Sequence, residues 1–297
     1  MKVGLIHFMA FPDTIKGDGP ILETLEQICN DEYFQVVELT HINDPGTRAK
    51  AIEQVKSSGK TVGFGAQPIV LINKLNPNSS DDAERQAAID ALKAGIDEAY
   101  EWDAAGFALL SGQVPAPDSV AREKELLVDT LTALCAHSQS KGDMPILLET
   151  FDQKPFGKNC LIGPTPDAVD VAEGVAAEFP SFGLMLDLSH MPLLEETTDQ
   201  MLKPPGRHLK HIHIGNCVMK DKNHPAYGDG HPRFGVEGGE NDVDELAAFL
   251  STLQEIGYIG PGKGNVVSFE VKPYGDETPE SVIRNAKDTL EAAWQKV

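Results

Sequence analysis

The sequence predicts a single (β/α)8 TIM barrel that occupies residues 1–297. Eight short apolar segments recur along the chain, and each is followed by a longer segment with helical periodicity. No change of composition and no linker interrupts this alternation, and a length of 297 residues suits one barrel of this kind. An open, doubly wound sheet is the alternative, which the lack of an early glycine-rich phosphate loop disfavours.

The predicted strands are continuously apolar, which is typical of parallel strands covered on both faces. They span residues 3–7, 35–39, 61–65, 106–111, 145–150, 182–188, 209–214 and 266–271. The predicted helices span residues 21–29, 47–56, 81–102, 118–137, 166–178, 195–202, 243–256 and 279–294. In Thr165-Pro166 and Thr278-Pro279, the threonine is expected to cap a helix and the proline to occupy its first turn.

Two connections are unusually long, residues 67–80 after the third strand and 215–241 after the seventh. Because both follow a strand and precede a helix, we expect them on the face of the barrel where chemistry occurs. Loops of this length usually serve as lids, binding loops or subunit contacts, so a homodimer is a plausible assembly.

The charge balance is strongly acidic, with 46 Asp and Glu against 25 Lys and Arg and a formal net charge of -21. Such a surface repels phosphate backbones and anionic membranes, so neither nucleic acid nor a membrane is an expected partner. The four cysteines show no CxxC spacing, and no signal or membrane-spanning segment is visible. We therefore expect a soluble cytoplasmic protein without a disulfide framework.

Potential metal ligands stand at or near the ends of four consecutive predicted strands. Glu149, Asp187, His213 and Glu270 each follow a run of apolar residues or close one. A carboxylate buried alone there would cost several kcal/mol, so it needs a cation or a hydrogen-bonding partner. Any one of them could be a salt-bridged strand-end residue, but four in register favour a shared ion.

Three carboxylates and one imidazole suit Mn²⁺, Mg²⁺, Co²⁺ or Zn²⁺, and the lack of thiolates disfavours a structural zinc site. We expect these four residues to share one divalent ion. His190, Asp229 and His231 form a second group that could bind another ion, contact substrate hydroxyls or simply order a loop.

Other polar residues on the same face are further candidates. Glu38 ends the second strand and could bind substrate or pair with a basic residue. His211 lies one pleat below His213 and is expected either to support it or to belong to the core. Arg233 and Lys272 are the candidate cations of the pocket, and His7 is a weaker candidate for its lining.

These motifs resemble the xylose isomerase-like barrel superfamily, which includes sugar isomerases, ketose 3-epimerases, inosose dehydratases and barrel-type apurinic endonucleases. The resemblance covers essentially the whole chain and is specific for the superfamily, not for one activity. It is carried by Leu148-Glu149, Leu186-Asp187-Leu188-Ser189-His190, His211-Ile212-His213, residues 229–239 and Phe269-Glu270.

Resemblance to the ketose 3-epimerases implies that the four strand-end residues bind one divalent ion, commonly Mn²⁺. It also implies that Glu149 and Glu270 exchange the substrate proton and that His190 contacts substrate oxygens. In the endonucleases, the equivalents of His190, Asp229 and His231 bind a further zinc. Here Gln67 stands where they have a metal histidine, and residues 110–112 lack another, so a three-zinc centre is incomplete.

We therefore expect a divalent-metal-dependent isomerase or epimerase of a keto-sugar or sugar phosphate, acting by proton abstraction beside a carbonyl through an enediolate. The alternative is a keto-sugar lyase or dehydratase that uses the same first step followed by β-elimination. A non-catalytic metal- or sugar-binding barrel and an apurinic endonuclease are less expected. Residues 262–264 and Arg233 are no more than weak candidates for binding a phosphate group, so phosphorylation of the substrate stays open.

Overall fold

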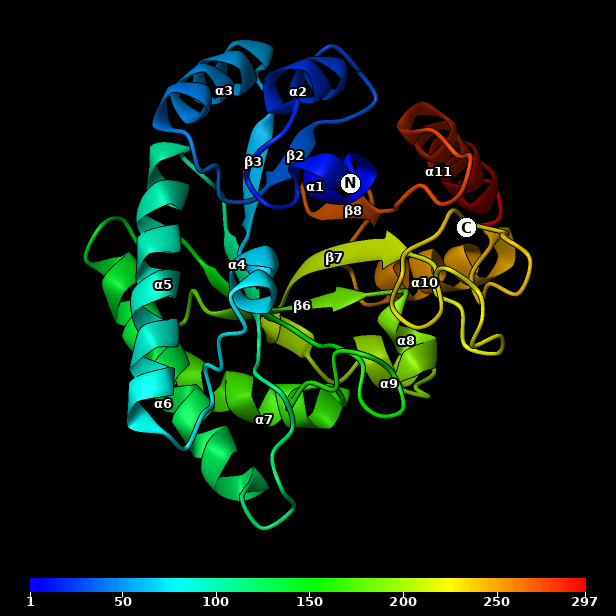
Figure 1. Ribbon diagram of the computed structural model, residues 1–297. Helices are drawn as coiled ribbons and strands as arrows, with labels where there is room; N and C mark the ends of the chain where they lie inside the picture. The colour runs from blue at the N-terminus through cyan, green and yellow to red at the C-terminus, as the bar shows by residue number, and fades with distance from the viewer.

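The computed structural model describes residues 1–297 and shows eight parallel strands closed into a barrel, with helices forming a ring outside it (Figure 1). Each strand pairs with the next in the chain, and the last pairs with the first. The strands are β1 (Lys2–Ile6), β2 (Val36–Leu39), β3 (Thr61–Gly65), β4 (Phe107–Leu110), β5 (Ile146–Glu149), β6 (Gly183–Asp187), β7 (Leu209–Gly215) and β8 (Val266–Glu270). The predicted (β/α)8 barrel is confirmed.

The long helices of the outer ring are α2 (Ile21–Cys29), α3 (Pro45–Ser58), α5 (Asp82–Glu101), α6 (Val120–Gln139), α7 (Thr165–Ala176), α10 (Val243–Glu255) and α11 (Pro279–Trp294). The shorter helices are α1 (His7–Ala10), α4 (Gln67–Ile72), α8 (His190–Leu193) and α9 (Thr198–Leu202), with 3-10 turns at Pro12–Thr14 and Gly206–His208. None of these helices is both long and apolar enough to cross a membrane.

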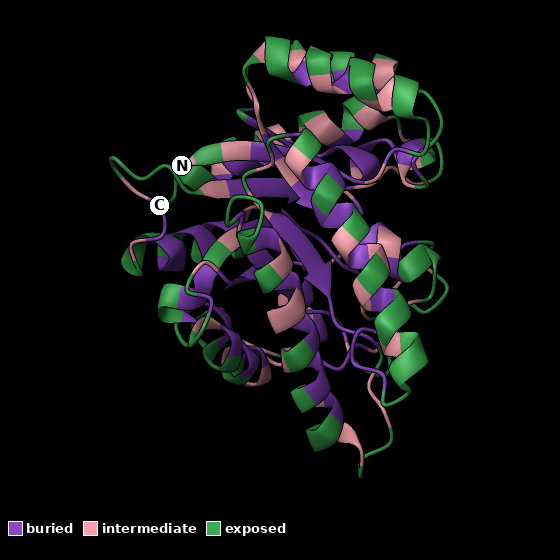
Figure 2. Ribbon diagram, turned by 90° about the vertical axis from the view of Figure 1, so that its left-hand side faces the viewer, coloured by how far each residue is buried: buried purple, intermediate pink, exposed green.

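Burial follows the layered architecture of the barrel. In Figure 2 the strands are almost entirely buried, and the helices are exposed on the side that faces away from them. Phe64 of β3 and Phe107 of β4 stack with their ring centroids 5.5 Å apart. A smaller apolar cluster of Ala108, Leu147 and Met185 lies apart from the main core. The main core therefore fills the space between the strands and the helices.

Of the two threonines that were predicted to cap helices, Thr278 caps its helix and Thr165 does not. The Thr278 hydroxyl accepts a hydrogen bond from the Ser281 N–H at 3.2 Å and caps α11, as predicted. Thr165 instead lies inside α7, which begins one residue earlier than expected, and its hydroxyl donates to Glu196 Oε2 at 2.6 Å. The Thr165 hydroxyl, which the sequence pattern assigned to the helix cap, is therefore hydrogen-bonded to the Glu196 carboxylate instead.

Short helices lie just after three of the strands, and none of these helices was predicted from the sequence. Helix α1 begins at His7, so His7 does not end the first strand. Helix α4 occupies the first part of the connection 67–80, which was predicted to be a loop. Helix α8 follows β6, and α9 begins at Thr198, not at residue 195. These helices are too short for apolar periodicity to reveal them.

The connection between β7 and α10 contains no helix and is held by one buried asparagine. Asn216 Oδ1 accepts hydrogen bonds from the N–H groups of Glu240 and Asn241 at 3.1 and 2.8 Å, and its amide donates to the carbonyl of Arg233 at 3.0 Å. Asn216 thereby ties the two ends of this long segment together. The segment is an ordered wall above the barrel, and it carries Asp229 and His231.

Candidate metal centre and active site

The structure brings the four predicted strand-end ligands together. One donor atom each from Glu149, Asp187, His213 and Glu270 lies within 4.8 Å of the others, and all four residues are buried. His213 Nδ1 lies 2.9 Å from Glu270 Oε2 and 3.5 Å from Glu149 Oε1. The parallel register explains the convergence, since Asp187 pairs with His213 and Glu270 pairs with Gly215, the last residue of β7.

The carboxylate oxygens of this cluster that lack a hydrogen-bonding partner suit a divalent cation as its ligands. Glu149 Oε1 and Asp187 Oδ2 are buried and have no hydrogen-bonding partner. Asp187 uses its other oxygen to accept from the Ser189 N–H at 2.7 Å, and burial raises the pKa of Asp187 to about 6. Burial would also raise the pKa of Glu270, but the neighbouring His231 and His213 hold it at about 2. Buried anionic oxygens aimed at one point suit a hard or borderline divalent ion.

Glu38 and His211 stand beneath the cluster, inside the barrel. Glu38 Oε2 lies 3.0 Å from His213 Nε2, and Glu38 Oε1 lies 2.7 Å from His211 Nε2. Gly63 makes room for this carboxylate, because a Cβ there would lie 3.0 Å from Glu38 Cγ. Glu38 therefore pairs with two imidazoles and not with a lysine or arginine, and His211 reaches the cluster through Glu38.

This contact determines which nitrogen of His213 would face a bound ion. With Nε2 donating its proton to Glu38, Nδ1 keeps a lone pair directed at Glu149 and Glu270. Carboxylates that hold a ligating imidazole in this way fix its tautomer and raise its basicity as a ligand.

We expect Glu38→Ala to weaken divalent-metal affinity about 10- to 100-fold while the barrel stays folded. Equilibrium binding of Mn²⁺ to the variant and the parent protein, with circular dichroism as a check on the fold, measures this. Glu123→Ala is a matched control, because Glu123 is a buried glutamate of α6 that contacts Asn78 and Ser80 instead. Unchanged Mn²⁺ affinity in Glu38→Ala would refute the orienting role.

The second predicted group also assembles, around Asp229. Asp229 Oδ1 lies 3.1 Å from His190 Nε2 and 2.8 Å from His231 Nε2. Both imidazoles are fully buried, and His231 holds a left-handed backbone with a φ of 52°. Burial would lower the pKa of His190, but Asp229 raises it to about 10. Asp187, His190 and His231 also offer three donor atoms within 4.8 Å of one another.

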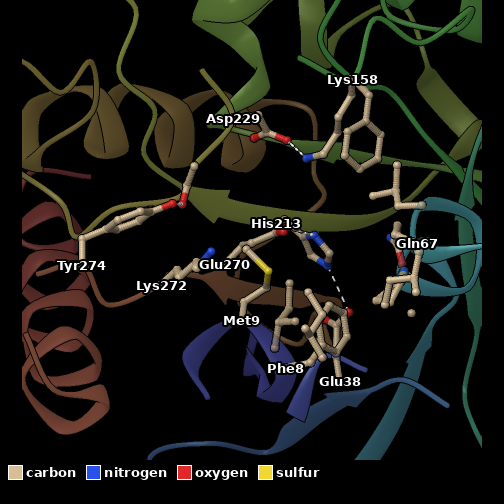
Figure 3. A pocket seen from close by; sticks show the side chains of 18 residues that line it. Phe8, Met9, Glu38, Gln67, Lys158, His213, Asp229, Glu270, Lys272 and Tyr274 are labelled. Carbon is tan, nitrogen blue, oxygen red and sulfur yellow. Dashed lines mark hydrogen bonds and ion pairs between the residues drawn. The ribbon is translucent and has the colours of Figure 1, made fainter. Parts of the chain in front are cut away.

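A cavity of about 190 Å³ opens above the cluster. Figure 3 shows Glu270, His213, Glu38 and Gln67 facing it on one side and Lys158 with Asp229 on another. Phe8, Met9, Ile15, Leu71 and Ile72 form an apolar wall contributed by α1, α4 and the segment after α1. A pocket with a polar floor and an apolar wall suits a small organic substrate.

Several predicted residues do not reach this cavity. Arg233 donates to Glu277 Oε1 at 2.9 Å and is absent from the lining, so it does not supply the pocket cation. His7 is buried and hydrogen-bonded to Thr24 Oγ1 at 2.7 Å. Residues 262–264 precede β8 and therefore lie at the opposite end of the barrel. Lys272 does line the cavity, as expected, with its ammonium 5.3 Å from the centre of the Tyr274 ring.

The sequence did not predict the contacts that three residues make in the site, namely Gln67, Lys158 and Tyr274. Gln67 donates to Glu149 Oε2 at 2.6 Å and covers that glutamate, so Glu270 lines the cavity whereas Glu149 does not. Lys158 forms an ion pair with Asp229, and Tyr274 donates to the Gly230 carbonyl at 2.6 Å. The one available signal for Lys158 and Tyr274 was their position in connections that follow ligand-bearing strands.

A known protein family matches most of this chain. The family model described as "Xylose isomerase-like TIM barrel" matches residues 29–293. The chain belongs to the xylose isomerase-like TIM barrel family. An uncharacterized protein of Methanocaldococcus jannaschii is 22% identical to this family member over 298 aligned positions, which cover 100% of the chain and 92% of that protein.

Solved structures of the same fold include sugar epimerases. A D-tagatose 3-epimerase-like protein superposes with a TM-score of 0.73 at 18% identity, covering 100% of this xylose isomerase-like chain and 99% of the other. The IolI protein with a bound zinc atom gives 0.72 at 18% identity, with the same coverage. D-psicose 3-epimerase from Clostridium cellulolyticum H10, solved with D-tagatose, gives 0.68 at 16%, covering 99% and 97%. At these identities the similarity establishes the fold.

Proposed function

We propose that this protein is a divalent-metal-dependent isomerase or epimerase of a keto-sugar, free or phosphorylated, that moves a proton on a carbon beside a carbonyl. The observation that carries the proposal is the convergence of Glu149, Asp187, His213 and Glu270 at the floor of a cavity with an apolar wall. Solved structures with a similar fold are named as sugar 3-epimerases or 3-epimerase-like proteins, which supports this choice of substrate class. Mn²⁺ is the ion we expect, and Zn²⁺, Co²⁺ or Mg²⁺ would also suit the donors.

When bound, the ion would supply Lewis-acid stabilisation for negative charge that develops on the substrate oxygens. Glu270 faces the cavity as an ionised carboxylate, so it is placed to accept the proton from carbon. Glu149 lies across His213 from Glu270, where it is placed to return a proton, and Gln67 holds it in position. Phe8 and Leu71 place an apolar wall beside this polar floor.

A lyase or dehydratase would need, in addition, an acid at the leaving group. His190 and His231 are the candidate acids in the sequence, and both are fully buried and absent from the cavity lining. Glu149 is buried and absent from the lining in the same way, so the choice between proton transfer and β-elimination rests on product analysis. The role of His190 in contacting substrate oxygens stays a prediction.

Incubation of the Mn²⁺-reconstituted protein with a panel of ketohexoses, their phosphates and 3-keto-sugars in D2O tests the proposal. We expect a product of unchanged elemental composition with deuterium at the carbon beside the carbonyl, detected by NMR and mass spectrometry. Loss of water or of an aglycone would indicate elimination instead. A protein that binds these sugars without any solvent exchange would be a binding protein and not an isomerase.

A further inference from the structure

Asp229 is shared between two kinds of partner. Its Oδ1 faces the two buried imidazoles of His190 and His231, a donor set that suits Zn²⁺ and similar ions. Its Oδ2 forms an ion pair with the ammonium of Lys158, drawn as a dashed line in Figure 3. The side chain of Asp229 is 3% exposed, so the charge of this carboxylate has to be balanced within the protein.

Lys158 is placed there by the loop that follows β5. Asp152, the third residue after that strand, is buried and accepts hydrogen bonds on Oδ2 from the N–H groups of Lys158 and Asn159 at 2.9 and 3.3 Å. The Lys158 ammonium then lies 4.6 Å from the centre of the Phe151 ring, on the cavity wall beside Asp229. Two independent contacts, one to the backbone and one to the side chain, thus direct the lysine at the second cluster.

Resting on the proposed function, we propose that the Lys158 ammonium takes the place of a second metal ion, so that this centre holds one divalent ion per chain. An ion bound to Asp229 would lie beside the ammonium, and the two positive charges would repel each other. The lysine already supplies the positive charge that the buried carboxylate requires.

The lysine also has donors left over for a substrate. An ammonium has three N–H donors, and Asp229 accepts one of them. Lys158 lines the cavity together with Glu270, so its remaining donors are placed to bind a substrate oxygen on the side of the pocket away from Glu38. Lys158 is therefore a substrate-positioning residue as well as the balancing cation of the second cluster.

Metal stoichiometry tests this inference without any substrate. The parent protein, Lys158→Met and Lys272→Met would each be stripped of metal, dialysed against excess Zn²⁺ or Mn²⁺ and analysed by inductively coupled plasma mass spectrometry. We expect one ion per chain in the parent protein, two in Lys158→Met and one in Lys272→Met. Lys272 is the matched control, because it lines the same cavity but has no carboxylate within ion-pair distance. The double variant Lys158→Met/Asp229→Asn should return to one ion.

Two ions in the parent protein, or one ion in a folded Lys158→Met variant, would overturn the inference and leave the isomerase proposal standing. No bound ion in the parent protein would instead remove the metal-dependent function itself. Should Lys158→Met fail to fold, Lys158→Arg is the second variant, since it keeps the charge and should retain one ion with wild-type thermal stability. Two ions in Lys158→Arg would contradict the charge argument.

Discussion

Replacing Glu149 or Glu270 with glutamine is expected to reduce turnover by roughly two to four orders of magnitude. Each substitution removes an anionic metal ligand and one of the two groups placed to exchange the substrate proton, while it preserves side-chain volume. Steady-state kinetics with the sugar found in the D2O experiment measures the loss. The metal content of each variant shows how much of that loss reflects a missing ion.

Glu123→Gln is the control for this pair. Glu123 is buried, accepts a hydrogen bond from the Asn78 amide at 2.6 Å and lies outside the cavity lining, so its substitution should leave turnover unchanged. Wild-type turnover in either Glu149→Gln or Glu270→Gln would contradict the roles assigned to these residues. A folded Glu270→Gln variant that keeps its metal but loses solvent exchange would support proton transfer by Glu270 directly.

Removing the metal ion is expected to abolish turnover and to lower the midpoint of thermal unfolding on the order of 5 to 10 °C. Without a cation, the buried Asp187 Oδ2 and Glu149 Oε1 have no hydrogen-bonding partner. Treatment with EDTA followed by calorimetry and activity assays measures both effects, and added Mn²⁺ or Co²⁺ should reverse them.

The Asp187→Asn variant tests whether EDTA lowers the unfolding midpoint by removing this metal ion or by a general effect on the protein. This variant loses one buried charge of the cluster, so EDTA should change its unfolding midpoint far less than that of the parent protein. Turnover that continues after verified removal of metal, or an equal shift in both proteins, would refute a metal ion as the organising element of the site.

The barrel itself could be predicted from the sequence because its signal is periodic and local. Parallel strands buried on both faces are continuously apolar, and the helices between them repeat their apolar residues with the helical period. Short elements escaped this kind of prediction. Helices α1 and α4 are held by contacts with the barrel and not by a pattern of their own, and Thr165 lost its expected capping role to Glu196.

The sequence by itself determined the fold and the four candidate ligands on successive strands. A carboxylate or imidazole that ends an apolar strand requires a partner, and parallel strands present their ends at one edge of the sheet. Only the tertiary structure decided how each ligand is held and what balances the second cluster. Gln67 and Lys158 reach Glu149 and Asp229 across 82 and 71 residues of chain, and Arg233 turns to Glu277. Contacts between such distant segments produce no periodic pattern in the sequence, because they depend on how the loops pack on the folded barrel.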